Sequence, residues 1–402
     1  MSRPPLEVAD IIRTHGADFL KSRGGLVSSA KKNVLHKLAV CRTAVLGGHA
    51  VECSHHCGFE KIAYNSCRDR HCPKCGAAGR FEWLEAREAD LLPVEYFHVV
   101  FTIPAVLAEI ALQNKKVMYD ILFKASAKTL KKIAADPKHL GAQIGFIGLL
   151  HTWGQNLQHH PHIHYVVPGG GLSADGERWI SCPPGFFLPV RVLSKVFRGI
   201  FLDLTRRAFA KGMLTFQGCL APLNDPDAFA AHLAPAYDTD WVVYAKPPFG
   251  GPAQVLKYLA GYTHRVAISN HRLLSMKDDK VSFRWKDYAH GDSQKIMTLS
   301  AIEFLRRFLL HVLPKGFVRI RHYGLLANPV RAKKLALCRS QLGETDKPAK
   351  IDDPEQADVA EPQEHQPGSP CPECEPGILV RRKLHRLNVA YPCFSPPGID
   401  SS

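Results

Sequence analysis

The sequence of 402 residues lacks the features of a membrane protein or a repeat protein. It contains no apolar run long enough to span a bilayer, no lysine-rich amphipathic anchor helix and no internal repeats. The first seven residues also lack the apolar core of a signal peptide. We therefore expect a protein without membrane partners that stays in the cytoplasm.

The sequence also has few acidic residues, with 37 Asp and Glu compared with 52 Lys and Arg. The formal net charge is +15 and the sequence pI is near 9.3. Hydrophobic residues make up 46% and charged residues 22%, which is ordinary for a globular protein, so the positive balance is the unusual feature. A balance of this size favours a polyanionic partner, and we expect nucleic acid.

Composition also indicates how the chain is divided. Residues 343–370 hold eight acidic residues, two lysines and five prolines without an apolar period, which predicts a disordered linker. Subtracting the −6 of this segment leaves +21 on the remainder, which strengthens the nucleic-acid interpretation. We predict an N-terminal module over residues 1–92, a main domain over 93–342, and a tail over 371–402.

Cysteine pairs mark the N-terminal module, after short helices expected over residues 8–20 and 34–44. In a reducing compartment such pairs are candidate metal ligands rather than disulfides. Each pair precedes a glycine, which lets backbone NH groups turn toward the sulfurs. We predict one structural Zn²⁺ site, and the alternative is a set of buried reduced thiols. The predicted ligands are Cys53, Cys57, Cys72 and Cys75, with Cys67 or His71 as substitutes.

Two further observations concern this predicted zinc module. Arg68 and Arg70 stand among its cysteines, where a small basic module can contact DNA phosphates. The C-terminal tail carries Cys371 and Cys374 in a Cys-Pro-Glu-Cys arrangement, which is half of a zinc site. We expect Cys393 or Cys338 to complete that site if the tail binds zinc.

The most informative stretch is a histidine-rich strand. Residues 162–167 alternate and include β-branched side chains, so His162 and His164 are expected on one face and Ile163 on the other. Pro161 suits the beginning of a strand. Two imidazoles side by side on rigid backbone can bind a metal ion, whereas the bland alternative is a strand edge with solvated rings.

The segments around this strand predict an α+β fold. We expect strands over residues 96–103, 144–153, 241–246 and 280–285, and helices over 106–135, 190–211 and 297–313. A strand, long helices and two adjacent strands in succession indicate an antiparallel sheet backed by helices.

A helix that begins at Pro252 carries Tyr258 and Tyr262, four residues apart and therefore on one face. Tyrosines at this spacing usually pack in a core. Beside a histidine pair they suggest catalysis, because a metal held by His162 and His164 can polarise a phosphodiester while a phenol oxygen attacks phosphorus.

Several neighbouring residues have roles that the sequence leaves open. A third metal ligand is expected from Gln155, His151, His159 or His160, and such a site would accept Mg²⁺ or Mn²⁺. The residues Lys246, His264 and Arg265 flank the tyrosine helix and either hold the scissile phosphate or lie on an ordinary surface. Arg319 and Arg321 lie between aromatic residues, which suits single-stranded DNA, although a solvated face is the alternative.

The order of these motifs resembles a known family. A cysteine-rich N-terminus, the His-hydrophobic-His strand and the downstream Tyr-x-x-x-Tyr helix are similar to the HUH endonucleases. Residues 151–157, 159–164, 168–171 and 258–269 resemble, within that superfamily, the two-tyrosine transposases of bacterial insertion sequences, in the family numbered ninety-one. The resemblance covers roughly residues 30–340.

The resemblance implies a ferredoxin-like catalytic sheet and rolling-circle transposition of single-stranded DNA at element ends and targets. One tyrosine would become linked to a 5′ phosphate and leave a free 3′ hydroxyl, and the other would serve the second strand exchange. The alternatives are a plasmid replication initiator or relaxase with the same chemistry, and a zinc-containing DNA-binding protein without activity.

Overall fold

The computed structural model describes residues 4–75, 87–246, 266–287, 291, 293–343 and 367–387. The chain forms two compact units. Unit 1 contains Met1–Ala78, Ile268–Val312 and Lys350–Ser402, and unit 2 contains Gly79–Ala267 and Leu313–Ala349. This division differs from the predicted boundaries at residues 92 and 342, because residues 268–312 and the tail belong to the unit that holds the N-terminus. The predicted linker lies mostly outside the described residues.

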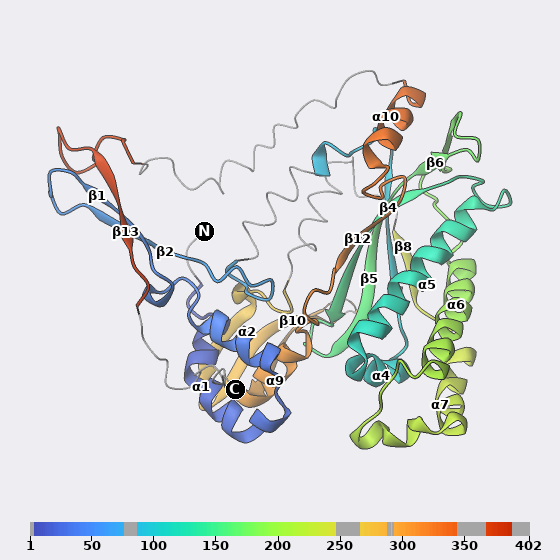
Figure 1. Cartoon of the computed structure of the whole chain (residues 1–402), viewed down its shortest axis with the longest axis horizontal. Helices are drawn as coiled ribbons and strands as arrows, with labels where there is room; N and C mark the ends of the chain where they lie inside the picture. Colours follow the sequence, from blue (N-terminus) through green and yellow to red (C-terminus); the bar gives the residue numbers. More distant parts are fainter. Residues whose placement is uncertain are drawn as a thin grey trace, which may run out of the picture. The chain divides into compact units, whose positions relative to one another are not determined.

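Unit 2 is built on a five-stranded sheet in the order β12-β4-β5-β3-β8 (Figure 1). Every neighbouring pair in this sheet is antiparallel. The strands are β3 (Tyr96–Thr102), β4 (Gly145–Trp153), β5 (His159–Pro168), β8 (Val243–Lys246) and β12 (Ile320–Gly324). The histidine strand β5 is therefore the central strand of the sheet.

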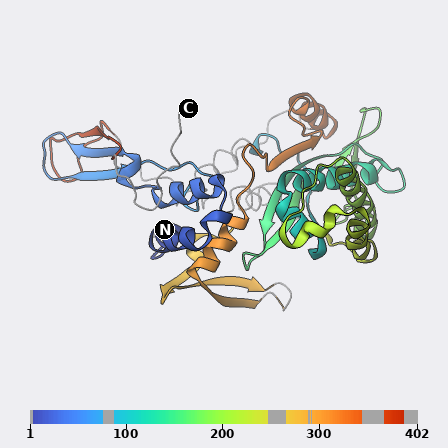
Figure 2. The same ribbon diagram turned by 60° about the horizontal axis from the view of Figure 1, so that its bottom comes forward.

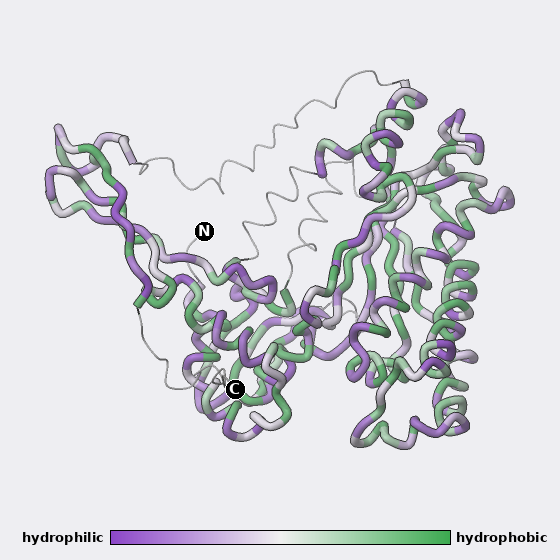
Figure 3. Tube along the Cα trace, in the orientation of Figure 1, coloured by the Kyte–Doolittle hydropathy of each residue, from purple (hydrophilic) through white to green (hydrophobic). Residues whose placement is uncertain are grey.

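Helices pack on one face of this sheet. They are α4 (Ala108–Gln113), α5 (Lys115–Ala135), α6 (Val190–Ala210) and α7 (Pro226–Asp238), with short 3-10 helices at Ala105–Leu107 and Gly218–Asn224. Along α5 and α6, green and purple bands alternate in Figure 3, as expected for helices with one buried and one exposed face. The predicted antiparallel sheet backed by helices is confirmed.

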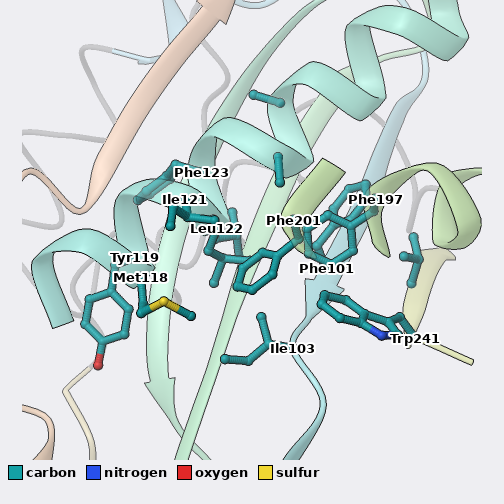
Figure 4. Close-up of a cluster of buried hydrophobic side chains, with 14 of the residues drawn as sticks. Phe101, Ile103, Met118, Tyr119, Ile121, Leu122, Phe123, Phe197, Phe201 and Trp241 are labelled. Carbon is teal, nitrogen blue, oxygen red and sulfur yellow. The ribbon is translucent and has the colours of Figure 1, made fainter. Parts of the chain in front are cut away.

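Aromatic residues fill the core between the sheet and these helices. The ring of Phe101 on β3 meets those of Tyr165 on β5 and Phe197 on α6 edge to face, with centroids 5.8 Å and 4.9 Å away. Figure 4 shows Phe101, Phe197 and Trp241 gathered in one cluster. Ile163 is fully buried in the same core, which confirms that it faces away from His162 and His164.

A glycine makes room for a tyrosine ring in this core. Gly148 on β4 lies opposite Tyr165 on β5, and a Cβ at Gly148 would lie 2.4 Å from the Tyr165 ring. The Tyr165 hydroxyl pairs with the Ser126 hydroxyl of α5 at 2.8 Å. The Tyr165 ring can therefore pack against the backbone of Gly148 while its hydroxyl forms a hydrogen bond to α5.

The opposite face of the sheet is partly covered by α10 (Arg331–Gln341). Leu335 and Cys338 of that helix are buried with Ile147, Leu149 and Val166 of the sheet. A small hairpin of β6 (Gly170–Leu172) and β7 (Trp179–Ser181) lies in the same unit. Cys338 is thus a core residue of unit 2.

Unit 1 combines helices with two small sheets. The helix α1 (Val8–Arg23), expected over residues 8–20, packs against α2 (Ser29–Ala39) and α9 (Ala301–Leu310) and buries Val8, Ile11, Ile12 and Phe19. One sheet contains β9 (Leu273–Lys277), β10 (Lys280–Asp287) and β11 (Ser293–Ser300). The prediction of a helix from residue 297 was wrong at its beginning, because β11 continues to Ser300.

The second sheet of unit 1 joins distant parts of the sequence. Its order is β13-β1-β2, with β1 (Gly48–Cys53), β2 (Glu60–Tyr64) and β13 (Leu379–Leu384) all antiparallel to their neighbours. In Figure 2 the red β13 runs beside the blue β1 and β2. None of the helices in the described part of the chain is long and apolar enough to cross a membrane.

Candidate functional site

Three histidines gather on the face of the sheet opposite the main core. His162 and His164 lie on β5, and His151 lies on β4 directly opposite His162. One ligand nitrogen from each residue lies within 4.8 Å of the others. We call this group the histidine cluster. Of the predicted third ligands, His151 is therefore the one that the structure brings to the predicted pair.

A bulge beside the cluster positions it. The pairing of β4 and β5 shifts between His151 and Trp153, which leaves His160 and Pro161 together opposite one residue of β4. Proline has no backbone NH to contribute to the ladder, so a bulge is a place where it fits. The strand thus begins before Pro161, earlier than predicted, and the bulge aims His162 toward His151.

Hydrogen bonds orient the rings of the predicted ligands. His162 Nδ1 lies 2.7 Å from the carbonyl oxygen of His160, so this nitrogen donates its proton and Nε2 keeps a lone pair. His164 Nδ1 lies 2.7 Å from Nε2 of His98 on β3. With the proton on His164 Nδ1, its Nε2 also presents a lone pair. Such supports are typical of metal-binding histidines, and sequence reasoning missed His98.

Burial favours the neutral form of these rings. It lowers the pKa of His162 to about 4, with a further contribution from the charge of His160. Burial, together with the charge of Lys246, also lowers the pKa of His98 to about 4. Neutral imidazole is the form that binds metals, so three nitrogen donors at this spacing fit a divalent cation.

The other predicted ligands lie outside the cluster. His159 faces α5, where its Nε2 pairs with the Tyr119 hydroxyl at 2.8 Å. The His160 ring is exposed and its centroid lies 5.3 Å from that of His162. Gln155 lies in the turn between β4 and β5 and is not part of the described histidine cluster.

The predicted catalytic tyrosines lie outside the described residues, as do His264 and Arg265. The chain is described up to Lys246, at the end of β8, which pairs with His98 in the sheet. Tyr244, two residues earlier, carries the Lys246 ammonium over its ring at 5.5 Å. Because Lys246 lies directly opposite His98, its side chain is on the same face of the sheet as the histidine cluster.

In unit 1 the cysteines form two clusters rather than the single predicted site. Cys72 and Cys75 join Cys41 and Cys67, and we call these four residues the N-terminal cysteine cluster. Sulfur–sulfur distances of 3.5 to 3.6 Å link Cys75 to Cys41 and Cys67, and Cys72 to Cys41. Cys53 and Cys57 instead join Cys371 and Cys374, and these four form the composite cysteine cluster.

This arrangement corrects the predicted ligand set. Cys67, predicted as a substitute, lies in the N-terminal cysteine cluster, whereas His71 pairs with Asp69 at 2.9 Å and is not a member. Cys338 is buried in unit 2, and Cys393 lies outside the described residues, so neither completes the described tail site. A hydrogen bond from Cys67 lowers the pKa of Cys41 to about 7, toward the thiolate that zinc requires.

The predicted DNA-contacting arginines differ in their surroundings. Arg68 is exposed next to the N-terminal cysteine cluster, and its backbone NH bonds to Cys75. Arg70 is half-buried, which lowers its pKa. Arg321 pairs with Asp120 and lies over the Phe123 ring at 4.2 Å. Arg321 thus has a packing role, and Arg319, which is half-buried, lies two residues before it.

Comparison with known proteins gives the class. Residues 145–334 match the family described as "Putative transposase", and residues 11–103 match the "Transposase zinc-binding domain". "Putative transposase y4qJ" of Sinorhizobium fredii is 58% identical over 343 residues, or 85% of this chain and 86% of that protein. "Transposase for insertion sequence element IS801" of Pseudomonas savastanoi is 28% identical over 316 residues, 77% and 73% of the two chains. No solved structure matches the chain.

The matched regions contain the histidine cluster in one case and six of the clustered cysteines in the other, so the protein is a transposase, which acts on DNA. More particularly, the chain belongs to the IS91 family of insertion-sequence transposases and carries that family's N-terminal zinc-binding domain. The family resemblance of the motifs is thereby confirmed.

Proposed function

We propose that this transposase cuts and rejoins single-stranded DNA through a tyrosine linked to the 5′ phosphate, as in rolling-circle transposition. The observation that carries the proposal is the histidine cluster on two neighbouring strands of the sheet, in a chain whose sequence places Tyr258 and Tyr262 after β8. Histidine ligands near a phenol nucleophile combine a phosphate-polarising site with a group that attacks phosphorus.

In this proposal the residues of the sheet prepare the site. His151, His162 and His164 hold a divalent cation, and His98 fixes the orientation of His164. Mg²⁺ or Mn²⁺ bound there would polarise the scissile phosphate and stabilise its developing charge. Since all three protein donors are nitrogens, Mn²⁺ should support activity at lower concentration than Mg²⁺, which prefers oxygen ligands.

The covalent step exchanges one phosphoester for another. The hydroxyl oxygen of Tyr258 or Tyr262 bonds to phosphorus while the bond from phosphorus to the 3′ oxygen breaks. The phenol loses its proton, and the departing 3′ oxygen is protonated to a hydroxyl. The second tyrosine repeats the step on the other strand, and attack by a 3′ hydroxyl on a phosphotyrosine rejoins DNA.

DNA positioning would use cations around this site and in unit 1. Lys246, His264 and Arg265 flank the tyrosine helix in sequence, and Lys246 carries its charge next to His98. Arg68 and Arg70 lie beside the N-terminal cysteine cluster, Arg319 directly precedes β12, and Arg321 lies within it. The exposed Arg68 is better placed for phosphate contact than Arg321, which is already paired with Asp120.

The test is detection of a covalent protein–DNA adduct on a denaturing gel. Labelled single-stranded oligonucleotides from the element's ends are incubated with the full chain and Mn²⁺ or Mg²⁺. Wild type should give an adduct that requires the metal. Tyr258→Phe and Tyr262→Phe should identify the attacking hydroxyl, with Tyr237→Phe, an exposed tyrosine of α7, as the matched control.

Three outcomes would change the proposal. DNA binding without an adduct, with both metals and both strands, would favour the inactive DNA-binding alternative. An adduct that never joins a second DNA end to the first would favour a nickase of the replication-initiator or relaxase kind. An adduct that survives in the double tyrosine variant would show that another residue is the nucleophile.

A further inference from the structure

The N-terminal hairpin of unit 1 takes its third strand from the C-terminal tail. β13 pairs with β1 over its whole length, from Gly48 opposite Leu384 to Cys53 opposite Leu379. β2 occupies the other edge of β1 (Figures 1 and 2). Both ladders of β1 are thus filled, one from nearby sequence and the other from more than 300 residues away.

At one end of this sheet the sulfurs of the composite cysteine cluster converge. Cys53 Sγ lies 3.4 Å from Cys374 Sγ, and Cys57 Sγ lies 3.6 Å from Cys371 Sγ. All four sulfurs lie within 4.8 Å of one another. A disulfide would bring two sulfurs to about 2.05 Å. Four thiolates at 2.3 Å from one Zn²⁺ would be separated by about 3.8 Å. The spacing therefore suits a shared ion.

Backbone NH groups already point at these sulfurs. The His55 NH lies 3.3 Å from Cys53 Sγ, and the Glu373 NH lies 3.4 Å from Cys371 Sγ. The NH groups of Phe59 and Gly377 bond to Cys57 and Cys374 in the same way. Each of the four sulfurs thus has a backbone NH donor, and such hydrogen bonds orient and stabilise metal-bound thiolates.

A glycine allows the chain to approach the cluster. A Cβ at Gly377 would lie 2.5 Å from Cys53 Sγ and 2.8 Å from Cys374 Sγ, closer than real contacts allow. Only glycine therefore lets the tail pass between these sulfurs. The requirement links Gly377 to the cluster itself rather than to a turn.

The apolar contacts of this sheet are few. Its buried cluster consists of Val51, Leu379 and two of the cysteines, with Phe59 and Cys374 packed against it. Most of β2 and β13 is exposed. A core of this size does not hold a separate three-stranded sheet, and small modules of this kind use a metal or disulfides instead.

We propose that Cys53, Cys57, Cys371 and Cys374 bind a second structural zinc ion, which joins the C-terminal tail to the N-terminal hairpin as one zinc ribbon. The N-terminal cysteine cluster binds the first ion independently. The matched zinc-binding region ends at residue 103 and so leaves the tail cysteines unassigned. The zinc ribbon is formed by residues from both the N-terminal hairpin and the C-terminal tail, and the proposal for it does not depend on the proposed mechanism of transposition.

Metal content of the purified full chain tests this proposal. Under reducing conditions wild type should contain two zinc ions per chain. The double variant Cys371→Ser and Cys374→Ser should contain one, and so should Cys41→Ser with Cys72→Ser. The matched control is Cys182→Ser with Cys219→Ser, two cysteines outside both clusters, which should retain two ions. A tail variant that keeps two ions, or a wild type with only one, would overturn the proposal.

A second measurement needs no variant and therefore does not depend on folding of a mutant. Iodoacetamide is added to wild type with and without a zinc chelator, and modified peptides are quantified by mass spectrometry. Bound zinc should slow alkylation of Cys371 and Cys374 by at least about tenfold, because only free thiolates react. Equal rates, or an intact mass lower by the two hydrogens of a disulfide, would contradict a zinc site in the tail.

Discussion

The histidine cluster lies on a sheet with a large apolar core, whereas the composite cysteine cluster lies on a sheet with almost none. His151, His162 and His164 lie on neighbouring central strands whose other face belongs to a large apolar core. Cys53 and Cys371 come from distant segments of a small, exposed sheet. The sheet of unit 2 would hold its ligands in place without a metal, whereas the small sheet of unit 1 would depend on the proposed zinc ion. In these proposals a metal serves chemistry in unit 2 and folding in unit 1.

Metal removal should separate the two scaffolds most strongly. A strong zinc chelator should abolish hydrogen-exchange protection of β1, β2 and β13, because structural zinc contributes about 10–16 kcal/mol in small zinc modules. The amides of β3, β4 and β5 should keep their protection and serve as the internal control. Added zinc should restore the first group. Unchanged protection in β1 after complete zinc removal would show that its apolar contacts suffice.

Adjacent residues on β5 should separate function from stability. His162→Ala removes a ligand and should reduce adduct formation by more than about 100-fold, with stability changed by less than about 1 kcal/mol. Ile163→Ala opens a cavity in the core and should cost about 2–5 kcal/mol. Adduct gels and urea unfolding measure the two effects, and His139→Ala, at an exposed loop histidine, is the control. Similar unfolding curves for the two strand variants would contradict the assignment of faces.

The support of His164 should be a smaller effect. His98→Ala removes the hydrogen bond to His164 Nδ1 and should weaken the metal dependence of adduct formation about 10–100-fold. High Mn²⁺ should recover most of the activity, and His98→Asn, which keeps a polar group, should lose less. A loss that saturating metal does not recover would assign His98 a role other than positioning.

A charged helix end should give the smallest effect. Hydrogen bonds from Arg306 and Arg307 lower the pKa of Glu303 from its ordinary 4.5 to about 2. The unfolded chain therefore binds more protons in this range, so the stabilisation is complete above about pH 5 and is lost as pH falls toward 2. Glu303→Gln should cost only about 1 kcal/mol at pH 7, because these pairs are partly exposed. Unfolding at pH 7 and pH 2 measures it, and a cost of the same size at both pH values would contradict it. Glu109→Gln, at an exposed position on α4, is the control.

The sequence predicted the histidine site more completely than the cysteine sites, for a physical reason. Alternation along β5 fixes which residues share a face, so His162, His164 and Ile163 were placed correctly from local pattern. His98 was not predicted because it contacts His164 from a neighbouring strand, and periodicity within one strand does not reveal which strands pair. The tyrosine roles stay predictions, since Tyr258 and Tyr262 lie outside the described residues.

The cysteines were grouped by their distance along the chain, and that criterion failed. Cys41 follows a helix and has no cysteine close to it in the sequence, and Cys371 lies more than 300 residues from Cys57. In both clusters the fold brings together cysteines that are far apart in the sequence. The beginning of α9 had a local signal that was overlooked. Ser300 accepts a hydrogen bond from the Glu303 NH, and a Ser-x-x-Glu sequence is a recognised helix beginning.

The pairing of β1 with β13 also sets an order of events during synthesis. A ribosome that has added Tyr64, the last residue of β2, must add 320 more residues to reach Leu384, the last residue of β13. At about 5–20 residues per second this interval lasts roughly 16–64 s. During that time one edge of β1 has no strand from its own chain. A nascent chain that stops before residue 379 leaves that edge without β13, so maturation of the hairpin depends on a segment made more than 300 residues later.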